Sequence, residues 1–160
     1  MQPGHIFVAQ QRGINVIKMV GDVRLTLCIS FDSFIEQMFS DAGFVSVVFD
    51  LRQALALDST TLGLMAKIAI TCERDFHFVP TVVSPDESIN RVLESMGLED
   101  IFEIVRSADT TMAKPEELTR IETETTQAKD KIIEAHKILM SLNDENKAEF
   151  RDLVECLEQE

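Results

Sequence analysis

Short apolar runs and amphipathic stretches alternate along the first 107 residues of the chain. Runs with a period of two, or with continuous apolar character, predict strands, whereas apolar residues three or four apart predict helices. In chain order the pattern predicts strands at 5–10 and 14–20, a helix at 25–39, a strand at 45–51, a helix at 59–72, a strand at 76–83, a helix from 84–86 to Gly97, and a helical turn with a last strand within 98–105. This order predicts an α/β fold, a mixed sheet backed by helices.

Turn and breaker residues refine these elements. Gln11-Arg12-Gly13 separates the first two strands and predicts a β-hairpin. Gly21-Asp22 is expected to end the second strand, and residues 52–58 are expected to form a connector. Pro80 lies inside a predicted strand, which indicates an edge position or an irregularity.

The composition changes after the first 107 residues. Residues 108–115 are predicted to be a polar linker, and residues 116–160 an acidic helical hairpin whose second helix restarts at Asn143-Asp144. The first helix, of about 25 residues, carries apolar and small residues at heptad spacing. These are Leu118, Ile121, Thr125, Ala128, Ile132, Ala135, Leu139 and Leu142. The stripe can be buried against the chain's own domain, against a second copy as a homodimer, or against another protein.

The formal charge of the 160 residues is -13, with 45% hydrophobic residues. This acidity makes nucleic acid and anionic membranes poor partners, and no apolar run approaches the roughly 18 residues that cross a bilayer. We expect a cytoplasmic protein. Cys28, Cys72 and Cys156 form no CxxC pair, so they indicate neither a zinc site nor a redox motif.

Asp58 and Ser59 stand at the predicted start of the helix at 59–72. Either residue could simply be the N-cap of that helix. Alternatively, the Ser59 hydroxyl is accessible and accepts a phosphoryl group, which the unpaired amides and the positive dipole end of a helix can hold. Both interpretations remain open at this point.

Catalytic chemistry has little support in the sequence. A serine nucleophile needs a positioned base, and His5, His77 and His136 lie near the terminus, in a predicted strand and on a polar face of the tail helix, where His136 is expected to have no specific role. Loops after adjacent strands could gather the carboxylates of Asp22, Asp50 and Asp58 around a metal, but solvated or capping carboxylates are the simpler interpretation. We expect no enzyme activity, no metal and no cofactor.

The Ser59 segment resembles the STAS domain of bacterial anti-sigma factor antagonists. The resemblance rests on Asp50-Leu51, a short loop and Asp58-Ser59-Thr60-x-Leu62-Gly63, and on Gly21-Asp22 after the second strand. It also includes Val92-Leu93-Glu94-Ser95-Met96-Gly97-Leu98 and Phe102-Glu103-Ile104, and it covers about residues 5–107. The acidic tail is similar to that of the longer antagonists of the HsbA type.

The resemblance implies a partner switch. An unmodified antagonist binds an anti-sigma factor and releases a sigma factor, a cognate serine kinase phosphorylates the serine after the aspartate, and a metal-dependent serine phosphatase restores binding. That serine is Ser59 here, with Thr60 and Thr61 as alternative acceptors. The implied docking residues are Asp22, Arg24, Asp58, Ser59, Thr60 and Leu62.

Two positions depart from the family pattern. Thr61 replaces a usual glycine and narrows access to the helix start, and Arg24 replaces an acidic residue of the docking surface. A different hypothesis is a constitutive scaffold that binds partners through its tail, with Ser59 as a cap only. A small-molecule-binding domain is a third class that the fold permits.

Overall fold

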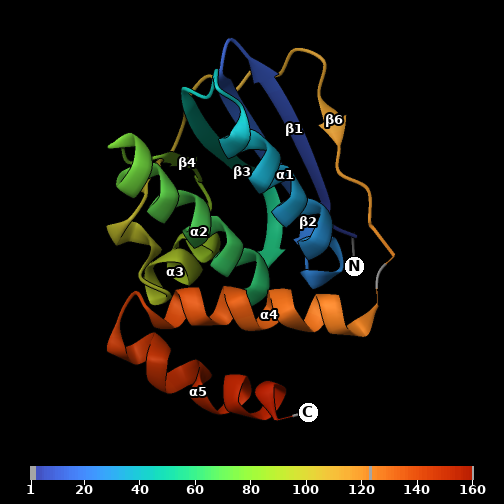
Figure 1. Ribbon diagram of the computed structural model, residues 1–160. Helices are drawn as coiled ribbons and strands as arrows, with labels where there is room; N and C mark the ends of the chain where they lie inside the picture. Colours follow the sequence, from blue (N-terminus) through green and yellow to red (C-terminus); the bar gives the residue numbers. More distant parts are fainter. Residues whose placement is uncertain (1–2, 123, 160) are drawn as a thin grey trace.

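The computed structural model describes residues 3–122 and 124–159, and Figure 1 shows their arrangement. A sheet in the order β5-β4-β3-β2-β1-β6 contains β1 (His5–Gln11), β2 (Ile14–Val23), β3 (Ser46–Leu57), β4 (Thr81–Val83), β5 (Glu103–Val105) and β6 (Glu116–Glu117). The helices are α1 (Cys28–Ser40), α2 (Ser59–Phe76), α3 (Glu87–Ser95), α4 (Thr125–Met140) and α5 (Asp144–Glu158), with 3-10 turns at Leu25–Leu27 and Leu98–Asp100. The predicted mixed α/β sheet is confirmed.

The sheet combines both strand directions. β1 and β2 form the predicted antiparallel hairpin, and Gly13 takes the positive φ of 81° that its turn requires. β2, β3, β4 and β5 run parallel, as crossover helices require. Side chains alternate along β1 and β2, so that residues such as Ile6 and Ile17 are buried beneath the helices.

Three predicted boundaries of the central strands are wrong. β2 continues past Gly21, whose φ of 74° and adjacent register shift form a bulge rather than an end. β3 continues through residues 52–57, which pair with the far end of β2 and bury Ala54, so this stretch is not a connector. Residues 76–80 are not a strand, because α2 extends to Phe76 and β4 begins only after Pro80.

The tail differs from its prediction at its start. Residues 116 and 117 form β6 against β1, and the amide of Leu118 donates to the carbonyl of Ile6 at 2.8 Å. The helix therefore begins at Thr125 rather than at Glu116, because this stretch pairs with the edge of the sheet.

The two tail helices pack on the chain's own domain. In Figure 1, α4 crosses beneath α1 and α2, and α5 lies on the far side of α4. Ala135 and Leu139 of α4 belong to the same buried core as the sheet and the helices α1 and α2. No helix in the described part of the chain is long and apolar enough to span a membrane.

Candidate functional site

Asp58 is the N-cap of α2. Its Oδ1 accepts a hydrogen bond from the amide of Thr61 at 2.9 Å, and its Oδ2 accepts one from the amide of Leu25 at 2.7 Å. The amide of Asp58 donates to the carbonyl of Val23 at 3.2 Å. One carboxylate thus joins the start of α2 to the turn that precedes α1. The question whether Asp58 or Ser59 caps the helix is settled in favour of Asp58.

Ser59 is the first residue of α2, and its half-buried hydroxyl meets a histidine from the tail. The Oγ of Ser59 lies 2.7 Å from Nε2 of His136, whose Nδ1 lies 2.7 Å from the carbonyl oxygen of Ile132. A carbonyl only accepts, so Nδ1 carries the ring proton when the imidazole is neutral, and Nε2 is an acceptor. The Ser59 hydroxyl therefore donates to Nε2.

The sequence analysis expected no specific role for His136, but its side chain makes specific contacts. It is only 2% exposed, and its ring packs edge-on against Phe150 of α5, with ring centroids 4.9 Å apart. The sequence offered one signal for this placement, since His136 is adjacent to Ala135, a member of the heptad stripe. A residue beside such a stripe reaches the interface when the helix lies close to its neighbour.

α4 and α2 approach one another closely at two small residues. A Cβ atom placed on Gly63 would lie 2.3 Å from the carbonyl oxygen of Ala135 and 2.7 Å from its Cβ. No side chain larger than hydrogen fits at position 63 while α4 stays in place. The absence of a Cβ on Gly63 is therefore what brings His136 within reach of Ser59, one helical turn earlier on α2.

A cluster of four charged residues joins α4 to α1 and α2. The buried carboxylate of Asp32 lies 2.9 Å from Nζ of Lys67 and 2.6 Å from Nζ of Lys131, and Glu134 completes the cluster. Burial alone would raise the pKa of the Asp32 carboxyl, but hydrogen bonds from Lys131 and Lys67 outweigh that effect and hold this pKa below its usual value. The tail is thus held by ionic as well as apolar contacts.

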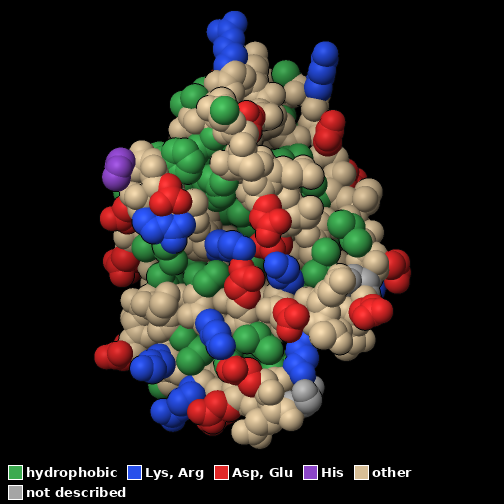
Figure 2. Space-filling view, in the orientation of Figure 1, with side chains coloured by type: hydrophobic (Ala, Val, Ile, Leu, Met, Phe, Trp, Pro, Cys, Tyr) green, Lys and Arg blue, Asp and Glu red, His purple; other side chains and the backbone are tan. Residues whose placement is uncertain are grey.

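Side chains in this part of the molecule carry both signs of charge. Figure 2 shows acidic and basic side chains intermixed on the face that α1, α2 and α4 present. The overall acidity of the chain therefore does not create a single anionic patch on this face.

The other predicted docking residues differ in exposure. Arg24 donates from Nε to Asp22 at 2.9 Å, with 59% of the Arg24 side chain and 9% of the Asp22 side chain exposed. Thr60 and Leu62 are 2% and 1% exposed, so a partner could not reach them in this conformation. Thr61, the other alternative acceptor, is also buried.

The side chain of Asp50 contacts Arg52 and Thr110 and not the residues around Ser59. Its carboxylate accepts two bonds from the Arg52 guanidinium, at 3.0 and 2.8 Å, and one from the Thr110 hydroxyl at 2.8 Å. Burial alone would raise the pKa of the Asp50 carboxyl, but these bonds hold it below its usual value. Asp50 thus fastens the linker to β3. Within residues 3–122 and 124–159, no group of three or more His, Cys, Asp or Glu residues is arranged to hold a metal ion.

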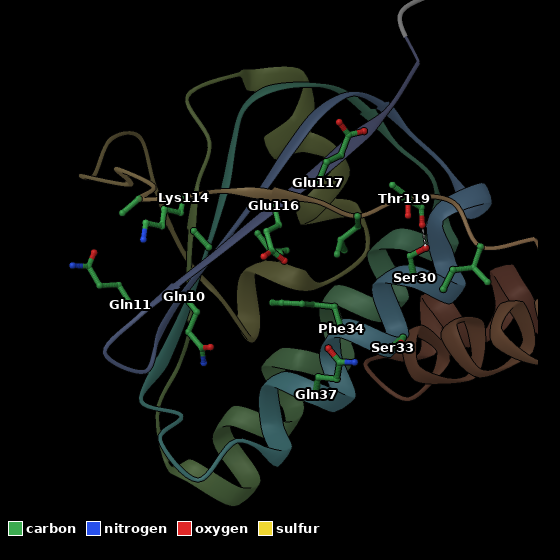
Figure 3. A pocket seen from close by; sticks show the side chains of 15 residues that line it. Gln10, Gln11, Ser30, Ser33, Phe34, Gln37, Lys114, Glu116, Glu117 and Thr119 are labelled. Carbon is green, nitrogen blue, oxygen red and sulfur yellow. Dashed lines mark hydrogen bonds between the residues drawn. The ribbon is translucent and has the colours of Figure 1, made fainter.

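A groove of about 750 Å³ lies between β1, α1 and residues 113–121 (Figure 3). Phe34 and Gln37 line it from α1, while Glu116 and Glu117 line it from the strand at the sheet edge. This groove is a separate surface from the start of α2, so it gives Ser59 neither a pocket nor a substrate path.

Comparisons with known proteins place the fold. No protein-family model matches the chain, and no curated protein matches its sequence. Among solved structures, the anti-sigma factor antagonist SpoIIAA in its unphosphorylated form is similar, with a TM-score of 0.54 and 12% identity over 65% of this chain and 89% of that one. An anti-sigma factor antagonist from Mycobacterium paratuberculosis is similar with a TM-score of 0.54 and 19% identity over 67% of this chain and 89% of that one. The predicted STAS fold is confirmed.

Proposed function

We propose that this chain is an anti-sigma factor antagonist whose binding is controlled by phosphorylation of Ser59. The unmodified protein binds an anti-sigma factor and so releases a sigma factor, in the cytoplasm. A serine kinase modifies Ser59 and ends binding, and a metal-dependent serine phosphatase reverses the modification. The similarity to solved anti-sigma factor antagonists supports the general role. The gate at Ser59 rests on the geometry of the α2 start.

The observation that carries the proposal is that Asp58, and not Ser59, caps α2. Asp58 provides the capping oxygen, so the Ser59 hydroxyl is not needed to hold the backbone of the helix. A phosphoryl group on Ser59 would add a charge of about -1.5 to -2 without removing that cap. It would lie at the positive end of α2, where an anion is stabilised. The helix would survive modification, and the surface beside it would become more negative.

The proposed docking surface combines Ser59 with the turn that Asp58 holds in place. Arg24 is well exposed and Leu25 is 42% exposed, and the amide of Leu25 is bound by the Asp58 carboxylate. A cation and an apolar side chain beside the acceptor suit a partner that presents both a carboxylate and an apolar residue. In this arrangement Thr60 and Leu62 support the corner from beneath, and Asp22 holds Arg24.

The second candidate function is a constitutive scaffold that binds through α5. One observation favours it, because Leu153 on α5 is 42% exposed. A partner, or a second copy of the chain, could bury this residue. Under that hypothesis Leu153→Glu would abolish partner capture, and phosphate at Ser59 would have no effect.

The test is capture of an anti-sigma factor from native cells by Ser59→Ala and Ser59→Asp. We expect Ser59→Ala to retain capture and Ser59→Asp to lose it, because the second variant places a fixed negative charge at the corner. Ser88→Asp is the control, since Ser88 lies in the first turn of another helix, α3, two residues after the capping Asp86. Equal capture by Ser59→Ala and Ser59→Asp would contradict the proposal.

A further inference from the structure

The half-buried hydroxyl of Ser59 lies against the chain's own tail. We propose that the α4–α5 hairpin is an intramolecular cover for the Ser59 side of the docking surface, whereas Arg24 and Leu25 stay exposed, and that a closed hairpin and a phosphate on Ser59 exclude one another. The anti-sigma factor and the kinase then reach the corner only when the hairpin has moved away. This inference rests on the proposed function and adds a competitor for the same surface.

The contact between Ser59 and His136 leaves no room for a phosphoryl group. Oγ and Nε2 are 2.7 Å apart, a hydrogen-bond distance, so phosphorus and its oxygens cannot be inserted while both side chains stay in place. The ring cannot retreat freely, because Phe150 packs against it and its Nδ1–H is engaged by the Ile132 carbonyl. Modification must therefore either turn the Ser59 side chain to another rotamer or move α4 itself, and the proposal assigns the movement to α4.

The hydrogen bond between Ser59 and His136 also favours an unmodified serine. With Nδ1 as the donor to Ile132, Nε2 of the neutral ring presents a lone pair to Ser59. In this form Nε2 accepts a hydroxyl hydrogen but has no hydrogen to donate to the oxygens of a phosphate. The closed hairpin thus favours the unmodified hydroxyl both by shape and by hydrogen bonding.

The attachment of the hairpin suits a reversible cover. Among the described residues of α4, only Ala135, His136 and Leu139 are buried, all in its second half. The chain before α4 is anchored as far as Thr119, whose carbonyl accepts from the Ser30 hydroxyl. Residues 120–122 and 124, which follow, are exposed.

The two tail helices are held together by their own contacts, so they can move as one unit. The side-chain amide of Asn146 on α5 donates to the carbonyl of Leu139 at 2.9 Å, and His136 packs against Phe150. Asn146 also donates to the carbonyl of Met96 at 2.7 Å, a contact with the end of α3 that opening would break.

The first experiment measures hydrogen–deuterium exchange of the α4 amides in the full-length protein. Phosphoserine incorporated at position 59 is expected to speed exchange in α4 by at least roughly tenfold, which corresponds to about 1.4 kcal/mol of closing free energy. Gly63→Ala should do the same without phosphate, because its methyl group would collide with Ala135. Gly43→Ala is the matched control, since its nearest neighbour lies 3.4 Å away. Unchanged exchange in α4 of the phosphoserine protein would overturn the cover.

The second experiment opens the hairpin without altering the docking surface. Lys131→Glu lies on α4 and places a third carboxylate beside Asp32 and Glu134. We expect faster exchange in α4, unchanged exchange in β2 and β3, and at least severalfold higher capture of the anti-sigma factor. Lys147→Glu, an exposed charge reversal on α5, controls for net charge. Faster exchange with unchanged capture would show that the hairpin does not block the partner.

The two experiments separate this inference from the function on which it rests. If phosphoserine at position 59 opens α4 and raises capture as Lys131→Glu does, the cover stands and the phosphate gate fails. If phosphoserine abolishes capture while α4 exchanges as in the unmodified protein, the gate stands and the cover fails.

Discussion

The carboxylate of Asp58 holds two parts of the corner, and its removal should cost a definite amount of stability. Asp58→Ala removes the acceptor for the Thr61 amide and the acceptor for the Leu25 amide. Losing the cap costs about 1 kcal/mol, and losing the second bond, which is near the surface, costs about 0.5–1.5 kcal/mol. We expect a total loss of about 2 kcal/mol, or a melting temperature lower by about 4–8 °C for a chain of this size.

Asp58→Asn separates the two bonds. Its single carbonyl oxygen can accept from one amide, while its NH₂ group faces the other, so we expect about half the loss of Asp58→Ala. Urea unfolding measures both variants, and hydrogen–deuterium exchange at the amides of Leu25 and Thr61 shows which bond is lost. Asp152→Ala is the control, because the Asp152 side chain is 93% exposed. Stability of Asp58→Ala within about 0.5 kcal/mol of the unaltered protein would refute the reasoning, since surface changes alone have effects of that size.

Two further predictions concern buried ionisable groups. Asp32→Asn should destabilise the protein by about 1–3 kcal/mol at neutral pH, because Lys67 and Lys131 lose a buried carboxylate. The folded-state pKa of Asp32 is lowered, so the contribution of its carboxylate to stability is complete above the ordinary value of 3.8 and is lost as the pH falls through the lower folded value. Urea unfolding measures the difference in stability between Asp32→Asn and the unaltered protein. Disappearance of that difference already at pH 5 would contradict this reasoning. A maleimide should modify only the exposed Cys156 in the native protein, since burial raises the pKa of the Cys72 thiol to about 12; mass spectrometry that finds rapid modification of Cys72 would show that the core opens.

Local patterns predicted the order of the elements but not where the strands end. The Gly13 turn and the apolar runs around it act over a few residues, and that hairpin was predicted. The length of β3 is set by pairing with the end of β2, which is distant in sequence. Leu118 fits a helical stripe equally well, but its backbone hydrogen bond to Ile6 of β1 determines its conformation. In both segments, pairing with a strand distant in sequence determines the conformation.

The candidate site shows the same limit. Asp58 and Ser59 could be identified from a strand, a loop and a helix start in sequence. His136 could not, because its contact with Ser59 spans 77 positions and depends on the close approach at Gly63. The sequence analysis placed His136 on a polar face, but its neighbours three and four positions away are apolar, namely Ile132, Ile133, Leu139 and Met140. Packing of α4 on α2 buries the side chain. Gly63 on α2 and Ala135 on α4 are local signs of that close approach.

The central claim is that Ser59 carries a phosphate in the living cell. Protein isolated from its native cells under phosphatase inhibition can be digested, and the peptide that contains residues 58–61 analysed by site-resolved mass spectrometry. The account predicts a phosphorylated fraction with the group on Ser59, which phosphatase treatment removes. A peptide that is never phosphorylated under any growth condition, or a phosphate confined to Thr60 or Thr61, would contradict it.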